Sequence, residues 1–192
     1  MSYFDFGAIK KILVVRLSSI GDIVHALPVA SVLRTNFPRA EIDWITEEPA
    51  FNLLATNKFL DRVLVFPRYN WRSLLKKRAF NRVWHEFKGF SRQLRSSNYD
   101  LVFDFHDILR SGFVVGLTRA PRRWGYGTQE GNKYFLTDKF SPVDPGLHTT
   151  EKHLRVLKDI GLPKSVVDFG FKAMGKPDFL KTKQPFVILH PF

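Results

Sequence analysis

The 192-residue sequence predicts an α/β fold, a parallel sheet flanked by helices. Short runs rich in β-branched and aromatic residues alternate along the chain with longer segments whose apolar residues recur at helical spacing, as in proteins of this class. Hydrophobic residues make up 44% of the sequence, an ordinary share for a globular domain, and a chain of this length usually builds one core.

Five segments have the composition of sheet strands. They are Lys11–Leu17, Glu41–Thr46, Arg62–Phe66, Tyr99–Phe105 and Arg122–Gly127. Helical spacing or end signals predict helices in the segments between and after them. These are Ile23–Phe37, Pro49–Ala55, a helix that ends at Leu117, and Thr150–Ile160, with Gly161 as its stop. Residues 128–149 are expected to be irregular.

The segment from Trp71 to Ser96 is long, basic and helical in pattern. Its apolar residues predict one packed face and one cationic face, and they are Phe80, Val83, Trp84, Phe87, Phe90 and Leu94.

The end of the sequence suggests a second domain. A Lys-rich, Pro-containing stretch over residues 172–185 is typical of a linker, and Phe186–Leu189 resembles a buried strand. We therefore expect a domain over residues 1–171, a linker over 172–185, and the start of another domain over 186–192.

Charge is unevenly distributed. Lys and Arg outnumber Asp and Glu by 30 to 18, for a net charge of +12. One acid, Glu86, faces ten cations within residues 62–95, which are Arg62, Arg68, Arg72, Lys76, Lys77, Arg78, Arg82, Lys88, Arg92 and Arg95. Such a segment attracts nucleic acid, an anionic membrane surface, or a phosphorylated or acidic-sugar substrate, although a solvated helix face would have the same composition.

Several kinds of chemistry lack their motif. The chain has no cysteine, which excludes disulfides, thiolate nucleophiles and Cys-based zinc sites. It has no phosphate loop, and Glu130 stands where the third glycine of a dinucleotide-binding motif would follow Gly125 and Gly127. The six histidines form no metal-binding motif, so we predict neither a cofactor nor a metal. With no visible secretory signal and no apolar run long enough to span a bilayer, a cytoplasmic protein is expected.

The turn after the first strand is the best candidate for a site. Ser18, Ser19, Gly21 and Asp22 lie between that strand and the first helix, where ligands bind in open α/β sheets. Gly21 allows close approach of the backbone to a ligand. Asp22 has two interpretations, because the start of a helix favours both a capping carboxylate and a general base that projects into a cleft.

The residues of this turn resemble a known family. Arg16–Pro28 (RLSSIGDIVHALP) closely resembles the N-terminal signature of glycosyltransferase family 9, the bacterial lipopolysaccharide heptosyltransferases, and is most like the type I enzymes. Further similarities follow in order along nearly the whole chain. They are Ile42-Asp43-Trp44 with Glu47-Glu48, the Arg- and Trp-rich segment, Asn98-Tyr99-Asp100 before a strand that ends in Asp104, Arg110-Ser111, Gly125-Tyr126, Tyr134-Phe135, His148-x-x-Glu151-x-x-Leu154 and Gly161-Leu162-Pro163.

The resemblance implies a GT-B architecture, in which two Rossmann-like domains face each other across a cleft, and this chain would supply the N-terminal, acceptor-binding domain. The acceptor would be Kdo-lipid A and the donor ADP-heptose, bound by the C-terminal domain, with inversion and without a metal. Asp22 matches the proposed catalytic base of the family. Ser18, Ser19 and Gly21 match its acceptor-site loop, and Arg68, Trp71 and Arg72 fall in the segment that supplies cationic acceptor contacts.

Two departures from the family qualify these expectations. Residues 129–133 (QEGNK) replace a segment in which type I enzymes carry an acceptor-binding arginine. Family members are also much longer, so this sequence is expected to hold a base and an acceptor platform without a donor pocket, and not to transfer sugar alone.

Two other functions remain open. One is an inactive, truncated module that binds the acceptor or a membrane surface. The other, a nucleic-acid binder, is less favoured because the aromatic residues of the basic segment have core spacing.

For a heptosyltransferase, the basic segment would hold the protein at the anionic inner membrane from the cytoplasmic side, at ~1 kcal/mol per well-placed cation.

Overall fold

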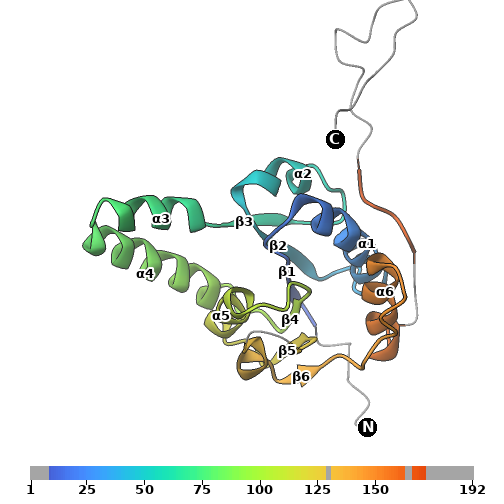
Figure 1. The fold of residues 1–192 in the computed structure, drawn as a ribbon. Helices are drawn as coiled ribbons and strands as arrows, with labels where there is room; N and C mark the ends of the chain where they lie inside the picture. The colour runs from blue at the N-terminus through green and yellow to red at the C-terminus, as the bar shows by residue number, and fades with distance from the viewer. Residues whose placement is uncertain (1–8, 129–130, 163–165, 172–192) are drawn as a thin grey trace, which may run out of the picture.

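The computed structural model describes residues 9–128, 131–162 and 166–171, and within them one parallel sheet forms the centre of the molecule (Figure 1). Its strand order is β3-β2-β1-β4-β5-β6. The strands are β1 (Lys11–Val15), β2 (Glu41–Glu47), β3 (Arg62–Phe66), β4 (Leu101–Asp104), β5 (Arg122–Gly125) and β6 (Asp138–Lys139). The predicted α/β fold is therefore confirmed.

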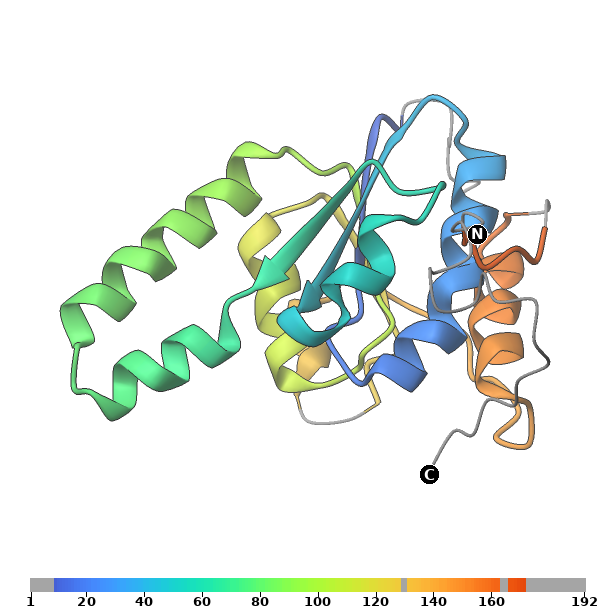
Figure 2. The ribbon, with the colours of Figure 1, turned by 90° about the horizontal axis from the view of Figure 1, so that it is seen from above.

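Helices cover both faces of this sheet (Figure 2). They are α1 (Ile20–Asn36), α2 (Phe51–Ala55), α3 (Arg68–Lys76), α4 (Phe80–Ser96), α5 (Leu109–Thr118) and α6 (Thr149–Asp159), with short 3-10 turns η2 (Glu48–Ala50) and η3 (Asn132–Phe135). Successive residues of β1 serve opposite faces, because strand side chains alternate. Ile12 and Val14 join the core beneath α1, α2 and α6, while Leu13 and Val15 join the core beneath α4 and α5.

The order of the strands places a crevice above β1 and β4. From β1 the chain runs outward through β2 to β3, and it then crosses back to β4 on the other side of β1. Val15, the last residue of β1, is in register with Ile45 and Asp104. All carboxyl ends lie at one edge of a parallel sheet, and ligands of open α/β sheets bind where the order reverses.

Three details differ from the sequence prediction. Helix α1 begins at Ile20, three residues earlier than expected, because Ser19 is its N-cap. The basic segment forms two helices, since the chain reverses at Arg78, whose φ of 54° lies in the left-handed region. The stretch expected to be irregular contains η3 and β6. The predicted linker over 172–185 and the strand after it lie outside the described residues.

Candidate functional site

Asp22 sits in the first turn of α1, at the carboxyl edge of the sheet. Its Oδ2 atom accepts the backbone N–H of Ser19 at 3.2 Å and the Ser19 hydroxyl at 3.1 Å. Asp22 is thus the third helical residue and not the N-cap, and it stabilises the start of α1 by accepting a donor that the helix leaves unpaired.

Arg16 holds the same carboxylate from the strand side. Its Nη2 lies 3.0 Å from Oδ2 of Asp22, and its Nη1 donates to the backbone carbonyl of Phe105. The side chain of Arg16 is 12% exposed and that of Asp22 45%. Burial alone raises the pKa of Asp22, but the Ser19 backbone N–H, the charge of Arg16 and the hydrogen bonds from both side chains together lower it below its usual value. Asp22 is therefore ionised at neutral pH.

A pocket of about 410 Å³ opens beside this turn. Its lining is Leu17, Ser18, Ser19, Ile20, Gly21, Glu47, Pro49, Ala50 and Tyr69. Three predicted substrate-binding residues, Ser18, Ser19 and Gly21, thus share one pocket. Asp22 is not among the lining residues, although Ser19 contacts both its carboxylate and the pocket.

A buried carboxylate closes one side of the pocket. Glu47, at the end of β2, is 2% exposed and lies 3.1 Å from Arg68 and 3.1 Å from Arg110. The structure therefore brings Arg68 to the pocket, through Glu47. Two guanidinium groups on a single carboxylate leave an excess of positive charge at this rim, which suits an anionic ligand.

Trp71 and Arg72 are placed differently. The Trp71 ring contacts Phe66, Phe87 and Phe90 at centroid distances of 5.5, 6.0 and 5.7 Å, so this side chain anchors α3 to the core and does not line the pocket. Arg72 is exposed on α3.

Sequence reasoning missed Tyr69, which supplies the aromatic ring of the pocket. The signal available in the sequence was its position next to Arg68, and in the structure the Arg68 guanidinium lies 5.8 Å from the Tyr69 ring. Residues 69 and 71 of a helix point in different directions, so only one of the two aromatic rings could face the pocket.

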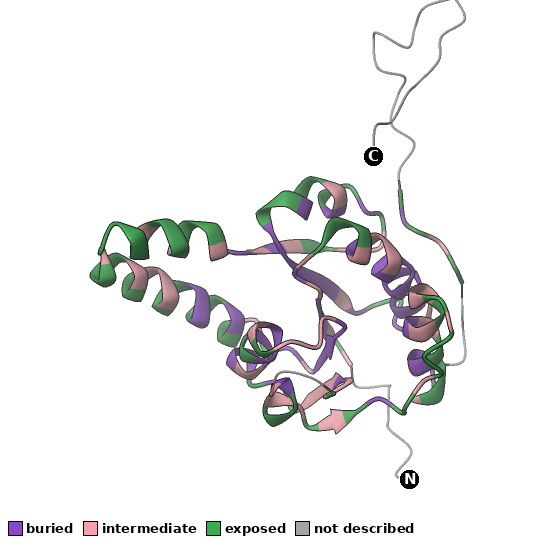
Figure 3. Ribbon diagram, viewed as in Figure 1, coloured by how far each residue is buried: buried purple, intermediate pink, exposed green. Residues whose placement is uncertain are grey.

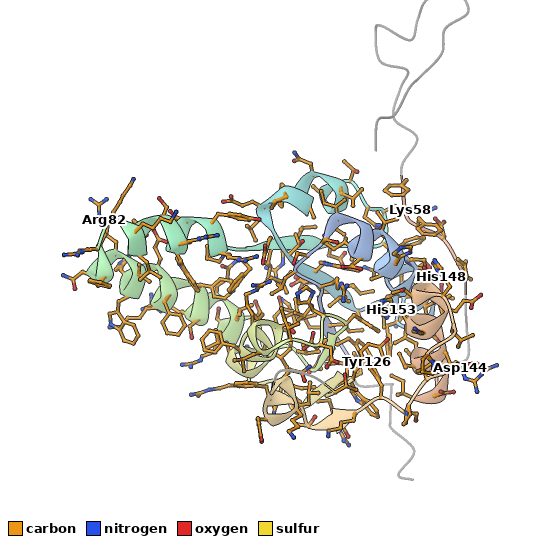
Figure 4. The ribbon with its side chains drawn as sticks, in the orientation of Figure 1. Lys58, Arg82, Tyr126, Asp144, His148 and His153 are labelled. Carbon is orange, nitrogen blue, oxygen red and sulfur yellow. The ribbon has the colours of Figure 1, made fainter. Side chains whose placement is uncertain are left out.

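Sequence reasoning also missed two histidines near the crevice, the half-buried His106 and the buried His153. His106 follows β4, and burial, followed by the charges of Arg16 and Arg110, lowers its pKa to about 4. On α6, Nδ1 of His153 lies 2.7 Å from the hydroxyl of Tyr126, and burial chiefly lowers the pKa of His153 to about 3. Figure 4 shows His153 and Tyr126 together beside the sheet. Both imidazoles are neutral at pH 7, and no local sequence motif marked them.

Asp104 organises the loop after β4. This fully buried carboxylate accepts the backbone N–H of His106 at 2.9 Å and the hydroxyl of Ser111 at 2.8 Å. Burial, only partly opposed by these hydrogen bonds, raises its pKa to about 6. Asp104 thereby fixes the position of His106 and the start of α5.

The described part of the chain lacks both a metal-binding cluster and a membrane-spanning helix. No group of three or more His, Asp or Glu side chains there is arranged to hold a metal ion. None of its helices has both the length and the apolar character needed to cross a membrane.

The sequence is similar to curated heptosyltransferases. Lipopolysaccharide heptosyltransferase 1 of Pseudomonas aeruginosa is 28% identical over an alignment of 172 residues, and the match covers 83% of this chain and 46% of that protein. Lipopolysaccharide core heptosyltransferase OpsX of Haemophilus influenzae is 24% identical over an alignment of 163 residues, and the match covers 81% of this chain and 42% of that protein. The chain thus spans about half the length of the curated relatives it matches. No family profile matches the sequence.

Solved structures share the fold. E. coli heptosyltransferase WaaC with ADP superposes with a TM-score of 0.69 at 24% identity, over 83% of this chain and 51% of that one. A family 9 glycosyl transferase from Veillonella parvula has a TM-score of 0.64 at 20% identity, over 82% of this chain and 43% of that one. The predicted resemblance, and the Rossmann-like fold it implied, are confirmed.

Proposed function

Because this chain resembles the N-terminal region of the family 9 lipopolysaccharide heptosyltransferases, we propose that it forms the acceptor-binding half of an inverting glycosyltransferase that transfers heptose from ADP-heptose to Kdo-lipid A. One observation carries the proposal. An ionised carboxylate, Asp22, is fixed at the carboxyl edge of the sheet beside a pocket with a basic rim. The donor nucleotide sugar would bind a second domain facing this edge.

In this mechanism Asp22 is the general base. The contacts from Ser19 and Arg16 all fall on Oδ2, so Oδ1 is the atom that accepts the proton of the acceptor hydroxyl. The hydroxyl oxygen attacks the anomeric carbon as ADP departs from the opposite face, which inverts the sugar. Because the pKa of Asp22 is lowered, proton transfer occurs late, when the forming C–O bond has already made the hydroxyl acidic.

The pocket would orient the acceptor. Ser18 and Ser19 offer hydroxyl groups, Gly21 leaves space for a close approach, and Tyr69 offers a flat surface on which a sugar ring can pack. Kdo carboxylates and lipid A phosphates are anions that pair with the forked guanidinium groups of Arg68 and Arg72. Trp71 contributes to acceptor binding by anchoring the helix that carries both arginines.

The acceptor would place the protein on the cytoplasmic side of the inner membrane, bound peripherally through its basic helices. The same helices support a second function, that of an acceptor- or membrane-surface-binding module without transferase activity.

Calorimetry of the 192-residue chain with deacylated Kdo-lipid A tests the acceptor assignment. We expect binding that weakens when salt is raised from about 0.1 M to about 1 M, since the contacts are ionic. Arg72→Gln should weaken binding, whereas Arg155→Gln, on the distant helix α6, should not. ADP-heptose should not bind. Absence of acceptor binding at low salt would contradict the assignment.

A chimera that joins residues 1–171 to the donor domain of WaaC tests the base. Asp22→Asn should lower the transfer rate by ~10²–10⁴-fold with unchanged acceptor affinity. Asp144→Asn, in an exposed loop, is the matched control. Full activity of Asp22→Asn would show that Asp22 only stabilises the start of α1 and is not the base. A chimera that binds acceptor but never transfers sugar would favour the second function.

A further inference from the structure

Helices α3 and α4 form a hairpin, residues 68–96, that projects well beyond the sheet (Figures 1 and 2). No residue of α3 is buried, and the buried residues of α4 are Phe90, Ser91 and Leu94, in its second half. Figure 3 accordingly shows the end of the hairpin nearest its turn as exposed. Half of the hairpin is therefore not needed to cover the core.

The exposed half nevertheless carries an apolar groove of about 300 Å³. Its lining consists only of Trp71, Leu75, Phe80, Val83, Trp84, Phe87 and Phe113. The rings of Trp84 and Phe87 stack at 5.5 Å, and Phe87 stacks on Phe113 of α5 at 5.9 Å. Phe80 is 62% and Trp84 57% exposed, so these rings face solvent at a cost that an apolar partner would remove.

The hairpin that carries this groove is also rich in cations. Nine of the chain's Lys and Arg residues lie in the hairpin, and its one acid, Glu86, accepts a hydrogen bond from Asn70. Arg68 pairs with Glu47. The remaining eight form no ion pair with any residue that the structure describes, and they are Arg72, Lys76, Lys77, Arg78, Arg82, Lys88, Arg92 and Arg95. Figure 4 shows Arg82 at the far end of the hairpin.

We propose that the α3–α4 hairpin docks on an anionic lipid bilayer, with the groove residues Phe80 and Trp84 entering the interface and the cations of the hairpin contacting lipid headgroups. A helical surface that combines exposed Trp, Phe and Leu with many Lys and Arg residues is typical of segments that lie in a membrane interface. Trp favours this region because its ring is apolar and its N–H is polar.

Charge also decides against a second copy of the chain as the occupant. Two hairpins packed through this groove would bring two sets of eight unpaired cations together, and like charges across an interface oppose association. An anionic bilayer satisfies both the apolar and the cationic parts of the surface. The inference deepens the proposed function, on which it rests for a lipid-borne acceptor, but its residues Phe80 and Trp84 lie outside the acceptor pocket.

Vesicle co-sedimentation of the 192-residue chain tests the proposal. We expect binding to vesicles of phosphatidylglycerol and phosphatidylethanolamine, weakening at high salt, and little binding to phosphatidylcholine. Changing Phe80→Ser and Trp84→Ser together should weaken binding roughly 10-fold or more, since two large apolar side chains no longer leave water. Tyr134→Ser, at a residue that is 79% exposed on another part of the molecule, should bind as the original chain does.

Fluorescence gives a second readout that does not depend on removing the apolar surface. Brominated lipids should quench the tryptophan emission of the bound chain, and Trp84→Phe, which keeps an aromatic ring, should still bind but show weaker quenching, since Trp71 of the same groove remains. Unchanged quenching in Trp84→Phe would show that Trp84 does not enter the interface and would overturn the proposal.

Two further results would also overturn it. One is equal binding to anionic and neutral vesicles, or no binding to either kind. In that case the proposed function is still decided separately, by acceptor binding measured with the soluble, deacylated ligand. The other is a dimer in sedimentation velocity that Trp84→Ser dissociates, since the groove would then be a subunit interface.

Discussion

The guanidinium of Arg16 joins the carboxylate of Asp22, 3.0 Å away, to the backbone carbonyl of Phe105. One mostly buried side chain at the end of β1 therefore connects the first turn of α1 to the residue that follows β4. The orientation of Asp22 depends on this connection as well as on the Ser19 cap.

Replacing Arg16 should change the titration of Asp22. In Arg16→Met the charge and the hydrogen bond are lost, so the pKa of Asp22 should rise. A carboxyl whose pKa is lowered in the folded state adds stability above its unfolded pKa, near 3.8, and loses it as the pH falls through the folded pKa. The variant should show less of this acid dependence. Carboxyl NMR titration and urea unfolding across this pH range measure both effects, with Arg155→Met, which breaks the exposed pair with Asp159, as control. An unmoved Asp22 pKa would contradict this role of Arg16.

Removal of the Glu47 charge should destabilise the pocket more than removal of either of its partners. Glu47→Gln leaves Arg68 and Arg110 facing each other without a counter-ion, and we expect a loss of about 1–3 kcal/mol in the free energy of unfolding. Arg68→Gln should cost less, because Arg110 still pairs with the buried carboxylate. Urea denaturation of both single variants and the double variant measures the difference. A larger loss for Arg68→Gln would show that Arg110 does not compensate.

Asp104 should make the protein less stable as the pH rises. Its folded pKa of about 6 lies above the unfolded value of 3.8, so the folded state binds more protons and this contribution falls between about pH 4 and pH 6. The slope for one such group is at most about 1.4 kcal/mol per pH unit. Asp104→Asn should remove this pH dependence. The difference between the stability curves of the original chain and the variant over this pH range measures the effect. Parallel curves would mean that Asp104 is ionised throughout.

Two helical glycines should respond oppositely to alanine. A Cβ on Gly112 of α5 would lie 2.8 Å from Cα of Asn132, so backbone must shift, and we expect a loss of about 1–3 kcal/mol. A Cβ on Gly89 of α4 meets nothing within 4 Å, and Gly89→Ala should stabilise the protein by about 0.5–1 kcal/mol. Thermal unfolding of the two variants tests the pair. A stabilised Gly112→Ala would show that η3 moves away freely.

Local patterns were sufficient for the strands and most helices. The apolar runs at residues 11–17 and 62–66 allow few structures other than buried strands, and Pro67 marks an end. The reversal at Arg78 had no such signal, because a non-glycine residue with positive φ carries no composition mark. The apolar spacing of residues 80–94 likewise did not show that only its second half is covered.

The sequence by itself determined the fold class, the turn that carries Asp22 and the basic character of residues 62–95, since each depends on residues close together in the chain. Only the tertiary structure decided which side chains meet. Glu47 lies between Arg68 and Arg110, Trp71 turns to the core while Tyr69 faces the pocket, and Tyr126 contacts His153. These partners are distant in sequence, and the packing of α3, α5 and α6 against the sheet brings them within hydrogen-bonding range or van der Waals contact.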